Sequence, residues 1–184
     1  MRSSNRAKTI TLILMATIQL LSVYYYFMYF ADNGYLPSPF VFDKSESFMD
    51  LFHPMWWASN DGRYTEWISV YPPLNFILLN IVKWISLGGA SFSDSFALRD
   101  AGYAIRVIFI CLYLLTPIIV LKTSPWESFS VGQKALTYLV VILSTPMLFA
   151  LERGNLVIFT LIFLALTLSN SGMRKSVSIA ILIN

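Results

Sequence analysis

A short polar stretch within an otherwise apolar sequence contains side chains that could transfer a proton. Residues 48–62 read FMDLFHPMWWASNDG and hold the chain's one histidine, His53, together with Asp50 and a tryptophan pair. Helical spacing predicts a short amphipathic helix over residues 47–58, with Asp50, His53 and Trp57 on one face. A carboxylate and an imidazole, which are common general acids and bases, would then be neighbours. The apolar face would consist of Phe48, Leu51, Phe52 and Met55.

Each of these side chains also has a purely structural interpretation. The sequence Ser47-Phe-Met-Asp50 fits a capping box, in which Asp50 would accept hydrogen bonds from the free amides at the helix start. His53 could be a packed residue with a polar tip. The pair Trp56–Trp57 could anchor the chain at a membrane interface or form a platform on which a sugar stacks.

A second polar site lies at Glu152 and Arg153, between two apolar runs that almost no loop separates. Charged residues close to membrane depth are costly and often functional. One interpretation is a mutually neutralised pair at a tight turn, with Gly154 ending the helix. The other is that the guanidinium of Arg153 holds a phosphate at the membrane surface.

The elements that must position these residues are membrane helices. The chain has 184 residues, of which 57% are hydrophobic and 12% charged. This composition predicts an all-α, polytopic membrane bundle with about five spans. A sixth apolar run begins at Ser176 and breaks off, so residues 1–184 are expected to be the N-terminal part of one membrane domain whose C-terminal half is missing. The expected spans are Thr9–Phe30, Pro72–Leu87, Ala104–Leu121, Gln133–Leu151 and Leu156–Leu168.

Charge distribution predicts the orientation of these spans. Three basic side chains lie within residues 2–8, which by the positive-inside rule places the N-terminus in the cytoplasm. The long segment 31–71 is then an outer loop, and it has an excess of four acidic side chains. The loop around residues 94–100 is expected back in the cytoplasm. Further counting puts the basic pair at 174–175 outside, so either a later span is re-entrant or this pair has little influence.

The outer loop resembles a known family when its motifs are read in order. Asp50-Leu51 at the helix start is followed by Gly62-Arg63-Tyr64, by Tyr71-Pro72-Pro73-Leu74 and later by Glu152-Arg153-Gly154-Asn155. This order is similar to that of the membrane glycosyltransferases of the GT-C superfamily, most closely the GT87 group of polyprenyl-phosphate-mannose-dependent mannosyltransferase-like proteins. The resemblance covers residues 9–169, about the first half of a typical member.

The resemblance implies a function and a site. The chain would transfer a mannose-like hexosyl unit from a polyprenyl-phosphate sugar to a glycolipid or glycan, at the outer face of a bacterial cytoplasmic membrane. Asp50 would be the catalytic base, with Asp32 as the second candidate. Arg153 would bind the donor phosphate, and the other expected substrate-binding residues are His53, Trp57, Tyr64 and Tyr71.

The expected partners are the donor, the acceptor and the lipid bilayer, with no nucleic acid. No cofactor and no metal ion is predicted, because the six acidic residues of the loop lack a recognisable ligand spacing; a divalent metal stays an open alternative. Two other functions also remain open. One is a polytopic transporter or lipid-linked-sugar flippase, and the other is a non-catalytic, truncated remnant.

Overall fold

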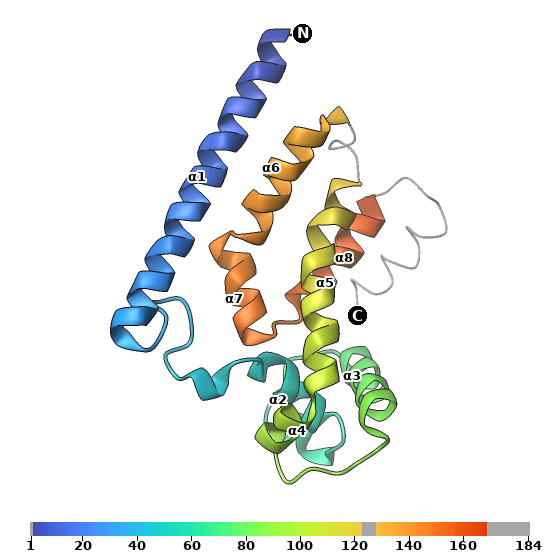
Figure 1. Ribbon diagram of the computed structural model, residues 1–184. Helices are drawn as coiled ribbons and strands as arrows, with labels where there is room; N and C mark the ends of the chain where they lie inside the picture. The colour runs from blue at the N-terminus through green and yellow to red at the C-terminus, as the bar shows by residue number, and fades with distance from the viewer. Residues whose placement is uncertain (1, 123–127, 169–184) are drawn as a thin grey trace.

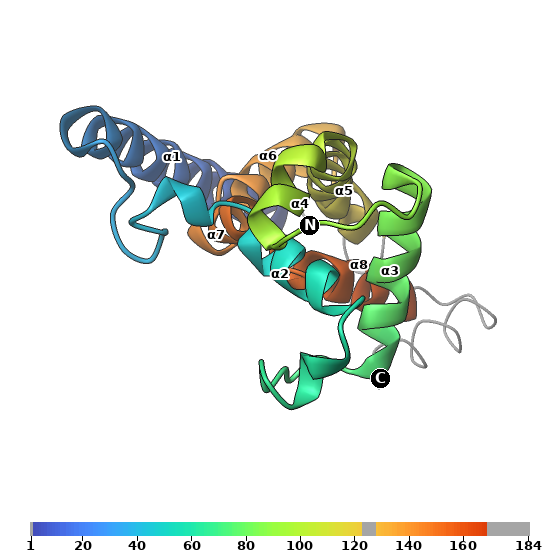
Figure 2. The same ribbon diagram turned by 90° about the horizontal axis from the view of Figure 1, so that it is seen from below.

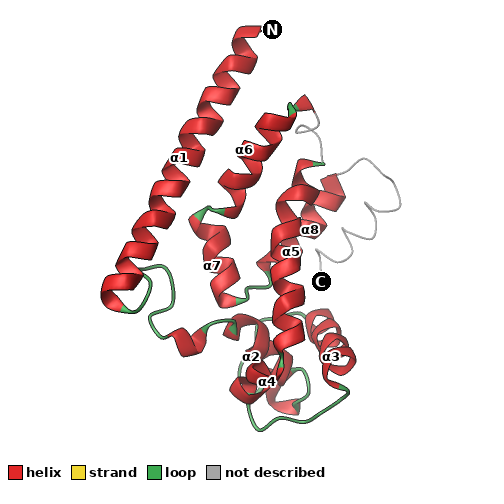
Figure 3. Cartoon of the chain, in the orientation of Figure 1, coloured by secondary structure: helices red, strands yellow, loops and turns green. Residues whose placement is uncertain are grey.

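All regular structure in the described part of the chain is helical, which confirms the predicted all-α class (Figures 1 and 3). The computed structural model describes residues 2–122 and 128–168. The eight α-helices and two 3₁₀ turns found there are α1 (Arg2–Asn33), η1 (Lys44–Glu46), α2 (Met49–Trp57), η2 (Asp61–Tyr64), α3 (Pro73–Leu87), α4 (Ser95–Ala101), α5 (Tyr103–Leu121), α6 (Val131–Ile142), α7 (Thr145–Arg153) and α8 (Val157–Leu168).

Two of these helices are long and apolar enough to cross a membrane. They are α1, over Asn5–Asn33, and α5, over Tyr103–Leu121. Apolar side chains of α1 such as Leu14, Ile18 and Phe27 are more than half exposed. Exposed apolar surface of this extent is unfavourable in water and indicates a lipid bilayer environment.

The predicted span over residues 133–151 is bent. Helices α6 and α7 are joined through Leu143 and Ser144 and lie at 54° to each other, so they count as a third span only if the bent pair is taken together. Pro146 in the first turn of α7 explains the break, because proline has no amide hydrogen to continue the bonding of α6. The described residues therefore contain two or three candidate spans, and the predicted number of five is not confirmed.

The predicted span Pro72–Leu87 has a different role in the structure. Its residues form α3, which has 15 residues and therefore measures only about 22 Å. Figure 1 shows α5 lengthwise and α3 nearly end-on, and in Figure 2 this is reversed. Helix α3 thus lies across the end of the bundle instead of running parallel to α5. Gly88, in the left-handed region at φ 62°, ends the helix after four turns.

The position of α3 places segment 88–102 on the same side of the bundle as segment 31–71. Helix α4 packs on α2, and the Trp56 indole nitrogen donates to the Phe92 carbonyl at 3.2 Å. Arg99 donates to the Ser45 carbonyl. The prediction that residues 94–100 lie on the opposite side from the outer loop is therefore wrong, because α3 does not cross. The predicted basic pair at 174–175 and the run from Ser176 lie outside the described residues.

The core is formed where α2 meets the bundle. Met49, Phe52 and Met55 of α2 are fully buried and pack against α4, α5, α7 and α8. A Cβ atom at Gly102, between α4 and α5, would lie 2.5 Å from the Phe52 ring, so only glycine permits this close approach. Helix α2 is therefore held inside the fold by its apolar face, and its polar face carries the residues singled out by the sequence.

Cysteine labelling tests this arrangement. In a Cys111→Ser background, cysteines at the exposed positions Asp61 and Ala90 should react with a membrane-impermeant maleimide from the same side of the membrane. A cysteine at Val131, which is 86% exposed at the other end of the bundle, should react only from the opposite side. Labelling of positions 61 and 90 from opposite sides would contradict the placement of α3.

Candidate functional site

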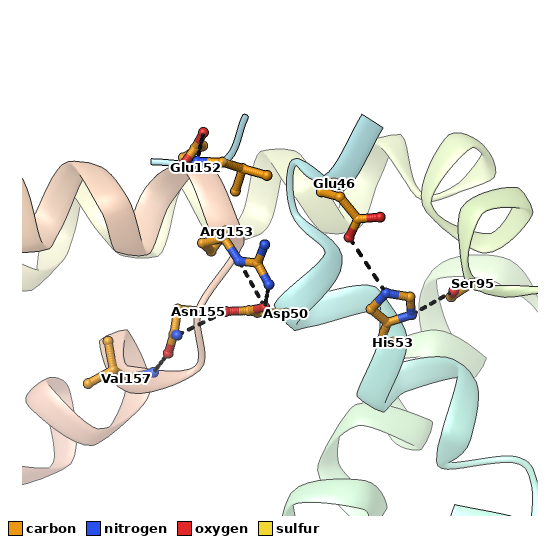
Figure 4. A network of polar contacts seen from close by, with 9 residues as sticks. Glu46, Asp50, His53, Ser95, Glu152, Arg153, Asn155 and Val157 are labelled. Carbon is orange, nitrogen blue, oxygen red and sulfur yellow. Dashed lines mark hydrogen bonds and ion pairs between the residues drawn. The ribbon is translucent and has the colours of Figure 1, made fainter. Parts of the chain in front are cut away.

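The central feature of the site is a network around the carboxylate of Asp50 (Figure 4). Arg153, the last residue of α7, donates from Nε to Asp50 Oδ1 at 3.0 Å and also from Nη2 to the same oxygen. Asn155 Nδ2 donates to Asp50 Oδ2 at 3.1 Å. The side chains of Asp50 and Arg153 are only 20% and 25% exposed. The structure thus brings together both charged groups for which the sequence predicted chemistry.

The start of α2 differs from the predicted capping box. The helix begins at Met49, and its N-cap residue is Phe48, in the left-handed conformation at φ 65° with no side-chain cap. The Phe48 amide donates instead to the Glu152 carbonyl at 2.8 Å. The capping prediction for Asp50 is wrong because its carboxylate is bound by a guanidinium, a stronger partner than a neutral amide.

The end of α7 is held by three separate contacts with preceding parts of the chain. The first is the Arg153–Asp50 contact, and the second is the Phe48 amide on the Glu152 carbonyl. In the third, the Glu152 carboxylate accepts from the Val41 amide at 3.0 and 3.1 Å. The interpretation of Glu152 and Arg153 as a mutually neutralised pair is therefore wrong, because each has its own partner. The expected ending of the helix at Gly154 is confirmed, with φ 67° and a turn that places Asn155 beside Asp50.

His53 is built into the contact between α2 and α4. Its Nδ1 lies 2.8 Å from the Ser95 hydroxyl, and Nε2 lies 3.9 Å from the Glu46 carboxylate (Figure 4). Burial lowers the pKa of His53 below its usual 6.5, although the charges of Glu46 and Asp50 oppose this. The imidazole is therefore neutral at pH 7. This arrangement fits the interpretation as a packed residue with a polar tip, and a substrate-binding role stays a prediction.

Aromatic rings continue from His53 along the polar side of α2. The His53 ring lies nearly parallel to Trp57 at 5.7 Å and 14°, and Trp57 in turn lies nearly parallel to Trp67 at 6.2 Å and 8°. Trp56 meets Trp67 edge-on at 5.2 Å. Trp57 is thus one ring of a stacked series, which confirms that it shares a face with His53; stacking against a sugar stays a prediction.

The two predicted tyrosines lie together, next to α3. The Tyr64 hydroxyl donates to the Tyr71 carbonyl at 3.3 Å, and both rings meet Phe76 edge-on at 5.6 and 6.3 Å. Burial raises the pKa of Tyr71, and the charge of Asp50 raises it further. Tyr71 therefore belongs to the electrostatic surroundings of Asp50. Asp32, by contrast, is exposed in the last turn of α1 and has no described contact with this network.

Sequence reasoning missed two functional candidates. Asn155 was part of a quoted motif, but nothing in its spacing indicated that its amide would reach the carboxylate of a residue 105 positions away. Lys83 is buried in α3, and the available signal was a lysine in the middle of an apolar run.

Among the described residues no group of three or more histidine, cysteine or acidic side chains could hold a metal ion.

Replacement of Gly154 tests how closely α2 and α7 must approach. A Cβ atom there would lie 3.0 Å from Leu51 Cβ and 3.1 Å from the Phe48 carbonyl oxygen, at a φ that side chains disfavour by about 1–2 kcal/mol. Gly154→Ala should therefore lower the thermal unfolding midpoint by several degrees, measured by circular dichroism in detergent. The matched control is Gly132→Ala, where a Cβ atom meets nothing within 4 Å. An equal effect of both changes would contradict the close approach.

The stability of the protein should depend on pH through His53. Because its folded-state pKa lies below 6.5, the folded state resists protonation, so stability is full above pH 6.5 and falls as pH decreases toward the folded pKa. His53→Asn should make the unfolding midpoint less dependent on pH between pH 7 and about pH 5. His53 is the chain's one histidine, so no other imidazole contributes. A wild-type midpoint that rises on acidification would contradict burial of the neutral ring.

Comparison of the chain with known proteins identifies no family. The chain matches no family model, no curated protein and no solved structure. The resemblance to GT-C enzymes therefore rests on the quoted motifs alone, and what it implies about function is a proposal.

Proposed function

We propose that this chain is part of a membrane-embedded hexosyltransferase that uses a polyprenyl-phosphate sugar as donor and a glycolipid or glycan as acceptor. The observation that supports the proposal is the contact between Asp50 and Arg153 at one end of an apolar bundle. A carboxylate can accept the proton of an acceptor hydroxyl, and a guanidinium can stabilise the charge on a departing phosphate. Asp50 and Arg153 both lie in the sequence motifs that resemble those of the family.

The reaction needs only these two side-chain functions. The acceptor oxygen attacks the anomeric carbon while its proton passes to Asp50 Oδ1. The bond between that carbon and the phosphate oxygen breaks, and its electron pair stays on the phosphate, beside Arg153. A single displacement of this kind inverts the anomeric configuration, and it requires one base instead of the carboxylate pair used in glycoside hydrolysis.

The network has to open before Asp50 can act. Both of its oxygens accept hydrogen bonds, Oδ1 from Arg153 and Oδ2 from Asn155. A donor phosphate offers the guanidinium more negative charge and more acceptor oxygens than the carboxylate does, so it competes for the same donors. We expect Arg153 to move toward the bound phosphate and to release Oδ1. The base would then be free only when the donor is present.

The charges at the two ends of the bundle support an outer-face location. The end with α2, α3 and α4 carries all nine described acidic side chains. At the other end, the charged side chains among the described residues are the basic ones Arg6, Lys8, Lys122 and Lys134. The positive-inside rule then places the N-terminus in the cytoplasm. In this proposal, segments 31–71 and 88–102 both lie on the outer side of a bacterial cytoplasmic membrane.

One observation bears on the alternative of a transporter. Broken helices are typical of transporters, and the bend between α6 and α7 is such a break. At this break the described polar groups are hydroxyls, with Tyr26 and Thr145 in contact at 2.6 Å. A transporter of charged substrates needs charged groups at this depth, whereas the described acidic and basic side chains lie at the two ends of the bundle. The distribution favours the enzyme.

The test uses transfer from a polyprenyl-phosphate [¹⁴C]mannose in membranes that contain the full-length protein. Asp50→Asn keeps the size of the side chain but cannot take the proton, so transfer should fall by about 10²-fold or more. Arg153→Gln should raise the apparent KM for the donor and leave that for the acceptor unchanged. Both variants lose the ion pair, so circular dichroism and unfolding midpoints must be recorded alongside.

The control is Asp100→Asn, which breaks a comparable ion pair with Arg99 at 2.8 Å on the exposed side of α4. Its transfer rate should stay close to that of the wild type. A folded Asp50→Asn protein with unimpaired transfer would exclude Asp50 as the base, and Asp32→Asn would then be examined. No transfer by the wild type with any polyprenyl-phosphate sugar would contradict the proposed reaction itself.

A further inference from the structure

Lys83, which is buried in α3 away from the Asp50 network, has no counter-ion among the described residues. The side chain of Lys83 faces the fold, and the residue is only 8% exposed. Its ammonium group donates to the Ser59 hydroxyl, and no acidic side chain of the described residues lies within ion-pair distance. Burial lowers the pKa of Lys83. A charge removed from water in this way is costly unless an anion compensates it.

A cavity adjoins this ammonium group. It has a volume of about 510 Å³, which lies in the range typical of small-molecule sites and far exceeds the roughly 30 Å³ of one water. Among the described residues that line the cavity, Lys83 is the one with a charged side chain. Asp94, next to the lining residue Ser93, is engaged by the Ala97 amide at 2.8 Å. The other walls are polar or aromatic, chiefly Trp56, Ser59, Asn80, Trp84 and segment 89–93.

The outer face of α3 is apolar and exposed. Ile77, Ile81, Trp84 and Ile85 follow one another at helical spacing and are between 48% and 71% exposed. A helix that lies across the end of a membrane bundle with such a face has the character of an interfacial helix, whose apolar side enters the lipid. Trp84 belongs both to this face and to the cavity wall. The cavity therefore borders the apolar face of α3.

We propose that this cavity binds the phosphate group of an anionic membrane lipid. Lys83 and the Ser59 hydroxyl hold the phosphate, Trp84 borders the glycerol region, and the acyl chains lie along the apolar face of α3. A free phosphate ion would satisfy the ammonium group but leave the larger part of the cavity and the apolar face uncovered. The site is separate from the proposed transfer reaction and does not depend on it.

The test measures lipid binding to the purified full-length protein in dodecyl maltoside by native mass spectrometry. The probes are dioctanoyl phosphatidylglycerol, uncharged dioctanoylglycerol and inorganic phosphate. The wild type should retain one phosphatidylglycerol, with dioctanoylglycerol at least about tenfold weaker because it lacks the group that pairs with Lys83. Inorganic phosphate should displace the lipid only at concentrations far above the lipid's own Kd.

Three variants locate the binding. Lys83→Met removes the charge but keeps an unbranched apolar chain, so the protein should fold, as circular dichroism can verify, while phosphatidylglycerol affinity falls by about tenfold or more. Lys83→Arg keeps the charge and should retain most of the affinity. Lys134→Met, at the opposite end of the bundle, should bind like the wild type and controls for general charge attraction.

The outcomes distinguish the sources of the anion. Equal affinity for phosphatidylglycerol and dioctanoylglycerol would overturn the phosphate site. Inorganic phosphate that binds as tightly as the lipid would overturn the lipid as ligand. Unchanged affinity in folded Lys83→Met, or an equal loss in Lys134→Met, would overturn the role of Lys83. None of these measurements uses sugar transfer. Failure of the lipid-binding proposal can therefore be distinguished from failure of the proposed transferase activity.

Discussion

The ion pair between Asp50 and Arg153 connects the two halves of this chain. It joins residues that are 103 positions apart, one in the first turn of α2 and the other at the last residue of α7. Two further hydrogen bonds lie directly beside it, from the Phe48 amide to the Glu152 carbonyl and from the Val41 amide to the Glu152 carboxylate. These contacts fix the orientation of α2, and α2 in turn carries His53, Trp56 and Trp57 to their partners on α4 and the loops.

The same pair limits how the carboxylate can act. A half-buried ion pair is weak evidence for stability, since desolvation offsets much of the attraction, but the loss of one partner leaves an uncompensated charge. Arg153 therefore holds the Asp50 carboxylate in place and also occupies one of its oxygens. Asn155 occupies the second oxygen and can stay bound while the first is released. In the proposed reaction, the Asn155 contact keeps Asp50 in place and the Arg153 contact is the one that a donor phosphate displaces.

Some of this arrangement could be predicted from the sequence, and the limits have physical causes. The apolar spacing of Leu51, Phe52 and Met55 located α2 because burial of one face dominates the stability of a short helix. The capping-box prediction was wrong because the pattern considers only residues close in sequence, whereas the partner of Asp50 is Arg153 of α7. The prediction that residues 72–87 cross the membrane was not confirmed. Hydropathy does not distinguish an apolar face that contacts lipid from one that contacts protein. The consequence was the wrong side for residues 94–100.

Arg153 and Lys83 look alike in the sequence, each a cation beside apolar runs, but the fold gives them different electrostatic environments. Arg153 has a carboxylate partner, so an incoming phosphate must replace an existing bond, and the net gain is a difference between two charge-assisted contacts. Among the described residues, Lys83 has only a hydroxyl as hydrogen-bond partner, so an anion that reaches it relieves a desolvation cost without displacing another charge. A displaceable contact suits a group that must release its ligand in every cycle, whereas an uncompensated cation favours a ligand that stays bound. Arg153 and Lys83 are therefore suited to a transient and to a resident anion, respectively.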